Sequence, residues 1–428
     1  MPSPTPNGAP AVVAAEADNP TSDEDYKDCP KSPSEPEPEF SLLVLPRELL
    51  LHICSFIDAK FVIRNLAAVC KHLNSVINDN VFWKARIGKR LKKKYPAIPV
   101  VESEFNWKKA CVSLEEQHRM WSNNAAGMDH FKYGDGIYAA CDSVHLMQNG
   151  SLLAIGSRDR HLHLISVDKL NAEEENSAKK SKLVAKNDAH TGWIWSMSSL
   201  DNVLVTGSWD MKIKLWDVGQ DLAEIRQMKT KSAVLCTHYE NNALFAGGYD
   251  KKVYHFDPRI SEMVCPPKRY HKQPVLSLLA NDQFLITASE DKNIVVYDRR
   301  ADAIFKTLTL AEYPMCMGAW QDQLWVGDKI GLIHLIDTTD GDFNIVETYD
   351  VGHKGKVTDI IQTTGALFTC STDKTVKVLE PCLSPAQPKV ITTLEQHIAD
   401  MASITFQNDV LCGASSDCTV SIWKPKKH

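Results

Sequence analysis

Seven copies of one short pattern occupy the sequence between residues 152 and 424. The clearest copy is VLVTGSWDMKIKLWD at residues 203–217, where a β-branched apolar run, the turn residues Gly-Ser-Trp-Asp and a second apolar run follow one another. This order predicts a β-hairpin, which by itself is only marginally stable. The other copies lie at residues 152–168, 244–257, 284–298, 324–337, 367–380 and 410–424. Such a chain has to pack its hairpins against one another.

Each copy carries an aspartate in its turn, and the spacing of these aspartates gives the size of the repeating unit. Subtracting successive positions gives spacings of 37 to 51 residues. A four-stranded propeller blade needs about 40–45 residues, so seven anchors predict seven blades. The widest spacing contains the charged stretch 171–182, which we expect to form a surface loop. The turn aspartates are Asp159, Asp210, Asp250, Asp291, Asp328, Asp373 and Asp417.

The Trp216–Asp217 pair, the Gly352–His353 pair and the recurring S-x-D turns resemble the WD-repeat family of β-propellers. The resemblance implies that a strand within residues 120–140 closes the ring by pairing with the last blade, whose edge would otherwise stay open. It also makes the fifth copy, with Gly327–Asp328 and no matching histidine, the most degenerate one.

In this family a histidine, a strand Ser or Thr, the turn Asp and the Trp form a hydrogen-bonded chain within a blade. His190, Ser208, Asp210 and Trp216 match this set. A buried carboxylate is costly to leave unpaired, so we interpret these four residues as structural and not as catalytic. Histidines that match the first member of the set also occur as His271, His353 and His397.

A different pattern precedes the repeats, because apolar residues between Leu45 and Ile87 recur at helical spacing and predict three short helices. The order of Leu45–Pro46, Val69–Cys70–Lys71 and Trp83–Lys84 resembles the F-box. The resemblance implies docking to the Skp-family adaptor, which bridges to a cullin and its RING subunit. Some of the matching residues must form the small domain's own core, and the sequence does not separate them. The residues implied to lie in the adaptor interface or to support it are Leu45, Pro46, Leu49, Ile53, Phe56, Leu66, Val69 and Trp83.

Four segments are therefore expected. Residues 1–39 contain nine of the 21 prolines and almost no large apolar side chain, which predicts a disordered acidic, Pro-rich tail. An F-box at 41–88 and a helical connector at 89–122 precede the propeller at 123–428. The predicted architecture is a small all-α F-box domain plus an all-β seven-bladed WD-repeat propeller, and the connector is expected to hold the two at a fixed distance.

Composition limits which classes of binding partner and which cellular compartment we expect for this chain. The formal net charge of −6, from 48 basic and 54 acidic residues, disfavours a nucleic-acid binder; the basic run at 84–94 fits the solvated face of a helix. No apolar stretch approaches the roughly 18 residues of a membrane span, and no signal peptide is recognisable. The 12 cysteines include no C-x-x-C pair and fit reduced core residues. We expect a cytoplasmic and/or nuclear protein.

No catalytic, cofactor-binding or metal-binding motif is recognisable. The sequence has no Walker loop, no H-E-x-x-H, no G-x-S-x-G and no zinc-type cysteine pairing. His161 and His163 face the same way on a strand, yet no third ligand follows nearby. GDGIYA at 134–139 is a weak match to a dinucleotide fingerprint, without the strand and helix that the fingerprint needs. We therefore expect a non-enzyme without a cofactor, whose function lies in binding.

The WD-repeat resemblance places the residue before each turn aspartate near the mouth of the central channel. This row is not repetitive, because Trp209 and Tyr249 lie beside a single arginine, Arg158. Trp193 and Trp195 enlarge the aromatic sector, although one of the two is expected to be core. A substrate recognised mainly through apolar and aromatic contacts is predicted, with a phosphate optional. The predicted substrate-binding residues are Arg158, Trp193, Trp209, Tyr249 and Glu290.

The function that these resemblances imply is that of a substrate receptor of a Skp–cullin–F-box ubiquitin ligase. The main alternative is an F-box/WD-repeat scaffold that assembles protein complexes without ubiquitin output. A propeller that binds chromatin or RNA through Lys89–Lys94 is a third possibility, which the near-neutral folded part disfavours. The substrate, its phosphorylation and the oligomeric state are left open by the sequence.

Overall fold

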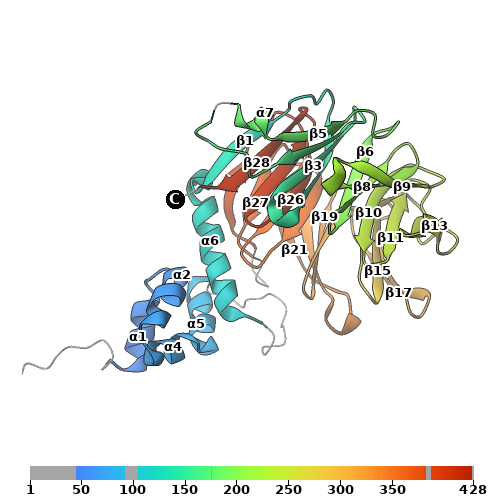
Figure 1. Cartoon of the computed structure of the whole chain (residues 1–428). Helices are drawn as coiled ribbons and strands as arrows, with labels where there is room; N and C mark the ends of the chain where they lie inside the picture. Colours follow the sequence, from blue (N-terminus) through green and yellow to red (C-terminus); the bar gives the residue numbers. More distant parts are fainter. Residues whose placement is uncertain (1–44, 92–104, 175, 382–386, 427–428) are drawn as a thin grey trace, which may run out of the picture. The chain divides into compact units, whose positions relative to one another are not determined.

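The computed structural model describes residues 45–91, 105–174, 176–381 and 387–426 (Figure 1). The predicted disordered tail at 1–39 lies outside these residues, as does the part of the basic run beyond Leu91. Within the described residues, no helix combines the length and the apolar character needed to cross a membrane.

The F-box region is a cluster of short helices. Asp58 caps the second helical run by accepting hydrogen bonds from the amides of Lys60 and Phe61. The run ends at Cys70, whose extended backbone separates it from the next helix and whose Sγ accepts from the amide of Leu73. Trp83 and Ile77 are completely buried in the core. The elements are α1 (Arg47–Cys54), α2 (Ala59–Phe61), the π-helical η2 (Val62–Leu66), α3 (Ala67–Val69), α4 (Lys71–Ile77) and α5 (Asn80–Leu91).

Helix α6 (Trp107–Ala125) contacts both the F-box helices and the propeller. On the F-box side, the buried guanidinium of Arg86 donates to both carboxylate oxygens of Glu115, at 2.7 and 2.9 Å, and to the carbonyls of Cys54 and Ile57. On the propeller side, Gln117 donates to Asp409 over 2.6 Å, and the ring of Trp121 packs edge-on against Phe368 at 5.6 Å. Helix α6 is thus held to the F-box helices through Glu115 and to the propeller through Gln117 and Trp121.

The remainder forms seven four-stranded antiparallel sheets, as predicted. The short helical elements between strands are η3 (Gln148–Gly150), α7 (Ser177–Lys180), η4 (Val218–Gln220) and η5 (Thr339–Gly341). Blades 1 to 4 are β2 (Cys141–Met147), β3 (Leu152–Ser157), β4 (Leu162–Ser166), β5 (Lys182–Lys186); β6 (Ile194–Leu200), β7 (Val203–Ser208), β8 (Lys212–Asp217), β9 (Ala223–Lys229); β10 (Val234–Glu240), β11 (Ala243–Gly248), β12 (Val253–Asp257), β13 (Glu262–Met263); and β14 (Val275–Ala280), β15 (Phe284–Ser289), β16 (Asn293–Asp298), β17 (Ala303–Thr309). Blades 5 to 7 are β18 (Pro314–Trp320), β19 (Gln323–Asp328), β20 (Leu332–Asp337), β21 (Asn344–Asp350); β22 (Val357–Gln362), β23 (Leu367–Ser371), β24 (Val376–Leu379), β25 (Val390–Leu394); and β26 (Met401–Gln407), β27 (Val410–Ser415), β28 (Thr419–Pro425) with β1 (Met128–Tyr133).

The ring closes through the N-terminal strand of the propeller, as the resemblance implied. Strand β1 pairs antiparallel with β28, from Met128 opposite Pro425 to Tyr133 opposite Val420 (Figure 1). This pairing gives the last blade its fourth strand and covers the edge that β28 would otherwise expose.

The hydrogen-bonded set of blade 2 differs from the prediction in one member. His190 Nδ1 lies 2.9 Å from Asp210 Oδ2, and His190 Nε2 lies 2.7 Å from the hydroxyl of Thr206, not of Ser208. The indole of Trp216 also donates to Thr206, at 2.9 Å. Ser208 stands at the strand end, where its hydroxyl accepts from the amide of Asp210. Thr206 lies two residues deeper on the same face, within reach of both rings.

The same arrangement recurs in blades 4 and 6, where His271 and His353 contact Thr287 and Thr369, four residues before the turn aspartate. In blade 7, His397 contacts Asp417, but the equivalent position is Gly413, which offers no hydroxyl. Blade 5 also has its four strands, but the turn aspartate assigned to it from the sequence, Asp328, lies two residues before the equivalent turn position. Pro314 pairs with Asp328 as Ile194 pairs with Ser208, so Asp328 takes the strand-end position. His334 Nε2 lies 3.2 Å from its carboxylate.

Replacing Thr206 by Val keeps the side-chain shape and removes the hydroxyl that both His190 and Trp216 contact. Each buried polar group left unsatisfied costs about 1–3 kcal/mol. We therefore expect Thr206→Val to lower the thermal unfolding temperature more than Ser208→Ala, which removes one acceptor from a turn amide. Differential scanning fluorimetry of both variants beside the wild type measures this, and an equal or larger loss for Ser208→Ala would contradict the reassignment.

Replacing Arg86 by Met breaks a buried ion pair and leaves Glu115 with an uncompensated charge. Removing one partner of such a pair costs about 3–5 kcal/mol, so we expect faster amide hydrogen exchange in α1, α5 and the first turns of α6, with the propeller strands unchanged. Lys60→Met is the matched control, because it removes the more exposed pair with Glu116. Equal exchange in the two variants would show that Arg86 does not hold α6 to the F-box helices.

Candidate protein-binding surfaces

The F-box residues singled out from the sequence divide by exposure. Trp83 is fully buried and its indole donates to the carbonyl of Ile77 over 2.7 Å, so it supports the domain and offers no surface. Leu45 and Leu66 are half-buried. The exposed ones are Pro46, Leu49, Ile53, Phe56 and Val69, with Phe56 76% exposed. The structure thus separates a core position from surface positions, which the sequence did not.

Two further apolar side chains of this surface were missed. Val81 is 69% exposed, whereas the adjacent Phe82 and Trp83 are buried, and Phe61 is 49% exposed. A signal was present for Val81, because three consecutive helical residues point in three directions and cannot all enter one core. A hollow of about 450 Å³ between α1 and α5 adjoins it, lined by Leu51 and Phe82 among others.

On the propeller, four aromatic rings from blades 2 and 3 form one continuous patch, which we call the aromatic cluster: Trp193, Trp195, Trp209 and Tyr249. The ring centroid of Trp209 lies 5.5 Å from that of Trp193, 5.8 Å from that of Trp195 and 5.9 Å from that of Tyr249. Exposure of Trp209 and Tyr249 is 38% and 54%. Rings this close and this exposed are typical anchors of protein interfaces.

The expectation that Trp193 or Trp195 would be core was wrong. Trp193 is exposed and Trp195 is half-buried, while Ile194 between them is completely buried. Alternate residues of an extended chain share a face, so both indoles lie on the solvent side and their rings stack.

Arg158 joins the aromatic cluster from blade 1. Its guanidinium lies 4.8 Å from the ring centroid of Trp193 and 5.7 Å from that of Trp195. It also donates from Nε and Nη2 to the two carboxylate oxygens of Asp142, at 2.8 and 2.9 Å. Burial raises the pKa of Asp142, and the hydrogen bonds from Arg158 oppose that rise. Two of the three guanidinium nitrogens are therefore already engaged within the chain.

The fifth predicted residue, Glu290, occupies the equivalent turn position of blade 4 and is exposed, with its amide bonded to the carbonyl of Pro274. The ring contacts of the aromatic cluster do not extend to it. In blade 5 this position belongs to Lys329 and not to Gly327, because the amide of Lys329 makes the equivalent bond to Tyr313. A lysine was thereby missed from the row around the channel mouth.

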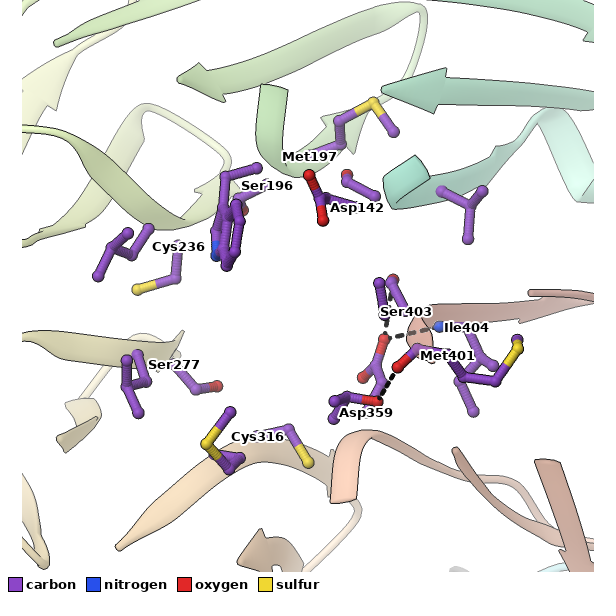
Figure 2. A pocket seen from close by; sticks show the side chains of 18 of the residues that line it. Asp142, Ser196, Met197, Cys236, Ser277, Cys316, Asp359, Met401, Ser403 and Ile404 are labelled. Atoms are coloured by element: carbon purple, nitrogen blue, oxygen red, sulfur yellow. Dashed lines mark hydrogen bonds between the residues drawn. The ribbon is translucent and has the colours of Figure 1, made fainter. Parts of the chain in front are cut away.

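The innermost strands of the seven blades surround a central cavity of about 630 Å³ (Figure 2). Arg158 and Trp195 line it at its mouth, so the cavity opens beside the aromatic cluster. No group of three or more His, Cys, Asp or Glu side chains among the described residues is arranged to hold a metal ion.

Comparison with known protein families matches both parts of the chain. The F-box-like family model matches residues 42–87. The WD domain, G-beta repeat model matches residues 181–217, 268–298, 344–379 and 388–424. Each of these four segments contains a histidine that contacts the turn aspartate of the same segment, namely His190, His271, His353 and His397.

Among solved structures, the WD40 β-propeller domain of Doa1 superposes with a TM-score of 0.59 at 19% identity, over 71% of this chain and 98% of that one. A computationally designed protein, Ika8, superposes with a TM-score of 0.51 at 15% identity. At these identities the likeness shows the propeller fold alone.

Curated relatives match across both parts. F-box/WD repeat-containing protein 9 of Bos taurus is 38% identical over 383 residues, covering 90% of this chain and 82% of its own length. The Homo sapiens protein of that name is 37% identical over 386 residues, covering 90% and 83%. F-box/WD repeat-containing protein mec-15 of Caenorhabditis elegans is 29% identical over 324 residues. The chain belongs to the F-box/WD repeat-containing protein family.

Proposed function

We propose that this chain is the substrate-recognition subunit of a Skp–cullin–F-box type E3 ubiquitin ligase. One observation carries the proposal: a single chain exposes two apolar surfaces, one on F-box helices and one at the mouth of a propeller channel. The first docks the adaptor, and the second binds a protein substrate. The chain itself performs no chemistry; it raises the effective concentration of substrate lysines near the ubiquitin-charged enzyme.

The exposed F-box side chains support the adaptor half of the proposal. Leu49 and Phe56 are 50% and 76% exposed on α1 and just after it, and Val69 follows on α3. Fully burying such a side chain is worth about 1.5–3 kcal/mol, so several of them on one small domain indicate a surface that a partner covers.

The aromatic cluster supports the substrate half. The guanidinium of Arg158 lies over the ring of Trp193, and its bidentate bond to Asp142 uses the guanidinium edge. Phosphate recognition by arginine depends on the same edge. The substrate is therefore recognised mainly through apolar and aromatic contacts, and a phosphate is optional.

Replacing Leu49 and Phe56 together by Glu places charges on the proposed adaptor surface without entering the core. Because two anchors are lost, we expect at least about a 100-fold weaker adaptor affinity. Co-purification of the full chain with the Skp-family adaptor and the cullin measures this, with Trp209→Ala as the control that retains both. Adaptor capture by the double variant would refute the assigned surface, and capture of adaptor without cullin by the wild type would favour the scaffold alternative.

Replacing Trp209 or Tyr249 by Ala removes an exposed anchor of the aromatic cluster. Hot-spot residues of this kind contribute about 2 kcal/mol or more, or roughly 30-fold in affinity. We expect each variant to lose the candidate substrate proteins that co-purify with the wild type, while the adaptor is retained. Ile260→Ala, an equally exposed apolar residue outside the cluster, is the control. An unchanged set of captured proteins in both variants would contradict the assignment.

A further inference from the structure

The seven inner strands place one equivalent side chain each around the cavity. Every inner strand carries an irregularity in its register near the start of its first pairing, for example between Val357 and Asp359 and between Met401 and Ser403. The residue after this irregularity lines the cavity, as Figure 2 shows for most of them. These equivalent residues, which we call the channel ring, are Ser143, Ser196, Cys236, Ser277, Cys316, Asp359 and Ser403.

Asp359 is the one ionised member of the channel ring. Four members are serines, and burial raises the pKa of both thiols, that of Cys236 to about 12, so they are neutral. The Asp359 carboxylate is held in place from blade 7, where the hydroxyl of Ser403 and the amide of Ile404 donate to Oδ2 over 3.0 Å each (Figure 2). The amide of Ile360 donates to Oδ1 over 2.9 Å.

Among the residues that the structure describes, no cation forms an ion pair with Asp359. In the described part of the chain, no Lys, Arg or His nitrogen lies within 4.0 Å of the Asp359 carboxylate. The neighbouring carboxylate of the cavity, Asp142, is paired with Arg158. Lys356 and Asp400 also line the cavity, and their carbonyls accept from the turn residues Thr372 and Ser416 at its mouth. Of the described residues that line the cavity, Asp359 is thus a carboxylate held by neutral donors, with no cationic nitrogen within 4.0 Å.

We propose that the bound substrate segment inserts a lysine or arginine side chain into the central cavity, where its cation pairs with Asp359. This inference rests on the proposed function, because it names the kind of side chain that the proposed substrate-binding surface recognises. A cavity of about 630 Å³ lies within the range of about 300–1,000 Å³ that ligand sites occupy. Trp195 and Arg158 belong to both the cavity lining and the aromatic cluster surface, so one peptide reaches both: apolar residues cover the aromatic cluster and a neighbouring basic residue enters the opening.

The test is peptide selection on the full chain bound to its adaptor. A random peptide display library is panned on the wild type, on Asp359→Asn and on Asp400→Asn, the last as a matched control that removes another carboxylate lining the cavity. We expect wild-type selections to fix one Lys or Arg beside aromatic or aliphatic residues. In a selected peptide, replacing that residue by norleucine should weaken wild-type binding at least 10-fold and leave binding to Asp359→Asn unchanged, with Asp400→Asn behaving as the wild type.

Asp359→Ser is a second variant that matches the channel ring, since four of its members are already serine; it keeps the test valid if Asp359→Asn folds poorly. Wild-type selections without a basic residue would overturn the proposal, as would a basic preference that persists in both Asp359 variants or disappears in Asp400→Asn. Failure of the ubiquitin-ligase proposal is seen separately, as loss of adaptor or cullin from the purified complex, and does not alter the selection result.

Discussion

The pairing of β1 with β28 is the interaction on which the rest of the structure depends. Without it the seventh sheet would end at β28, and Ile422 and Trp423, both buried, would lie next to an open edge. The same strand follows α6 directly, after three residues with positive φ at Asn123, Asn124 and Ala125 and a glycine at 127. A Cβ on Gly127 would approach the backbone of Met120 to 2.8 Å, so the tight junction requires glycine. The strand that closes the ring, β1, is therefore also the strand to which helix α6 is joined.

The buried aspartates of the propeller show how strongly local partners decide their charge. Burial alone would raise the pKa of Asp210, yet hydrogen bonds from His190, Thr191 and Ser208 bring it to about 2. This carboxylate adds stability above its unfolded value of about 3.9, and the contribution is lost as the pH falls towards 2. For Asp359, burial outweighs its neutral donors and raises the pKa to about 6. Its ionisation opposes folding, so stability is lost as the pH rises from about 4 through 6.

Repeat spacing made the seven blades predictable, because hairpins of this period have few ways to bury their apolar faces, and the resemblance to WD repeats implied the closing strand. What failed was assignment within a repeat. Thr206 and Ser208 share a face and a chemistry, and only depth along the strand distinguishes them. In blade 5, Asp328 was aligned by residue type, whereas strand pairing puts Lys329 at the channel mouth.

The candidate surfaces were predictable in location but not in detail. A motif match selected the candidate F-box residues, yet the burial of Trp83 depends on helix orientations that the periodicity of short helices does not determine. The channel ring was not visible in the sequence at all, because the register irregularity that aligns Asp359 with serines and cysteines is defined only once neighbouring strands pair.

The junction between α6 and β1 also bears on the order of events during synthesis. His130 and Ser421 touch across the closing pair although they are 291 positions apart in the chain, so β1 has no partner until the ribosome has made nearly everything that follows it. Contacts of such long range form slowly, and exposed strand edges invite wrong pairing in the meantime. The helices of residues 47–91, in contrast, find their main partners within the first part of the chain. A nascent molecule would therefore present its F-box well before the propeller exists to hold a substrate.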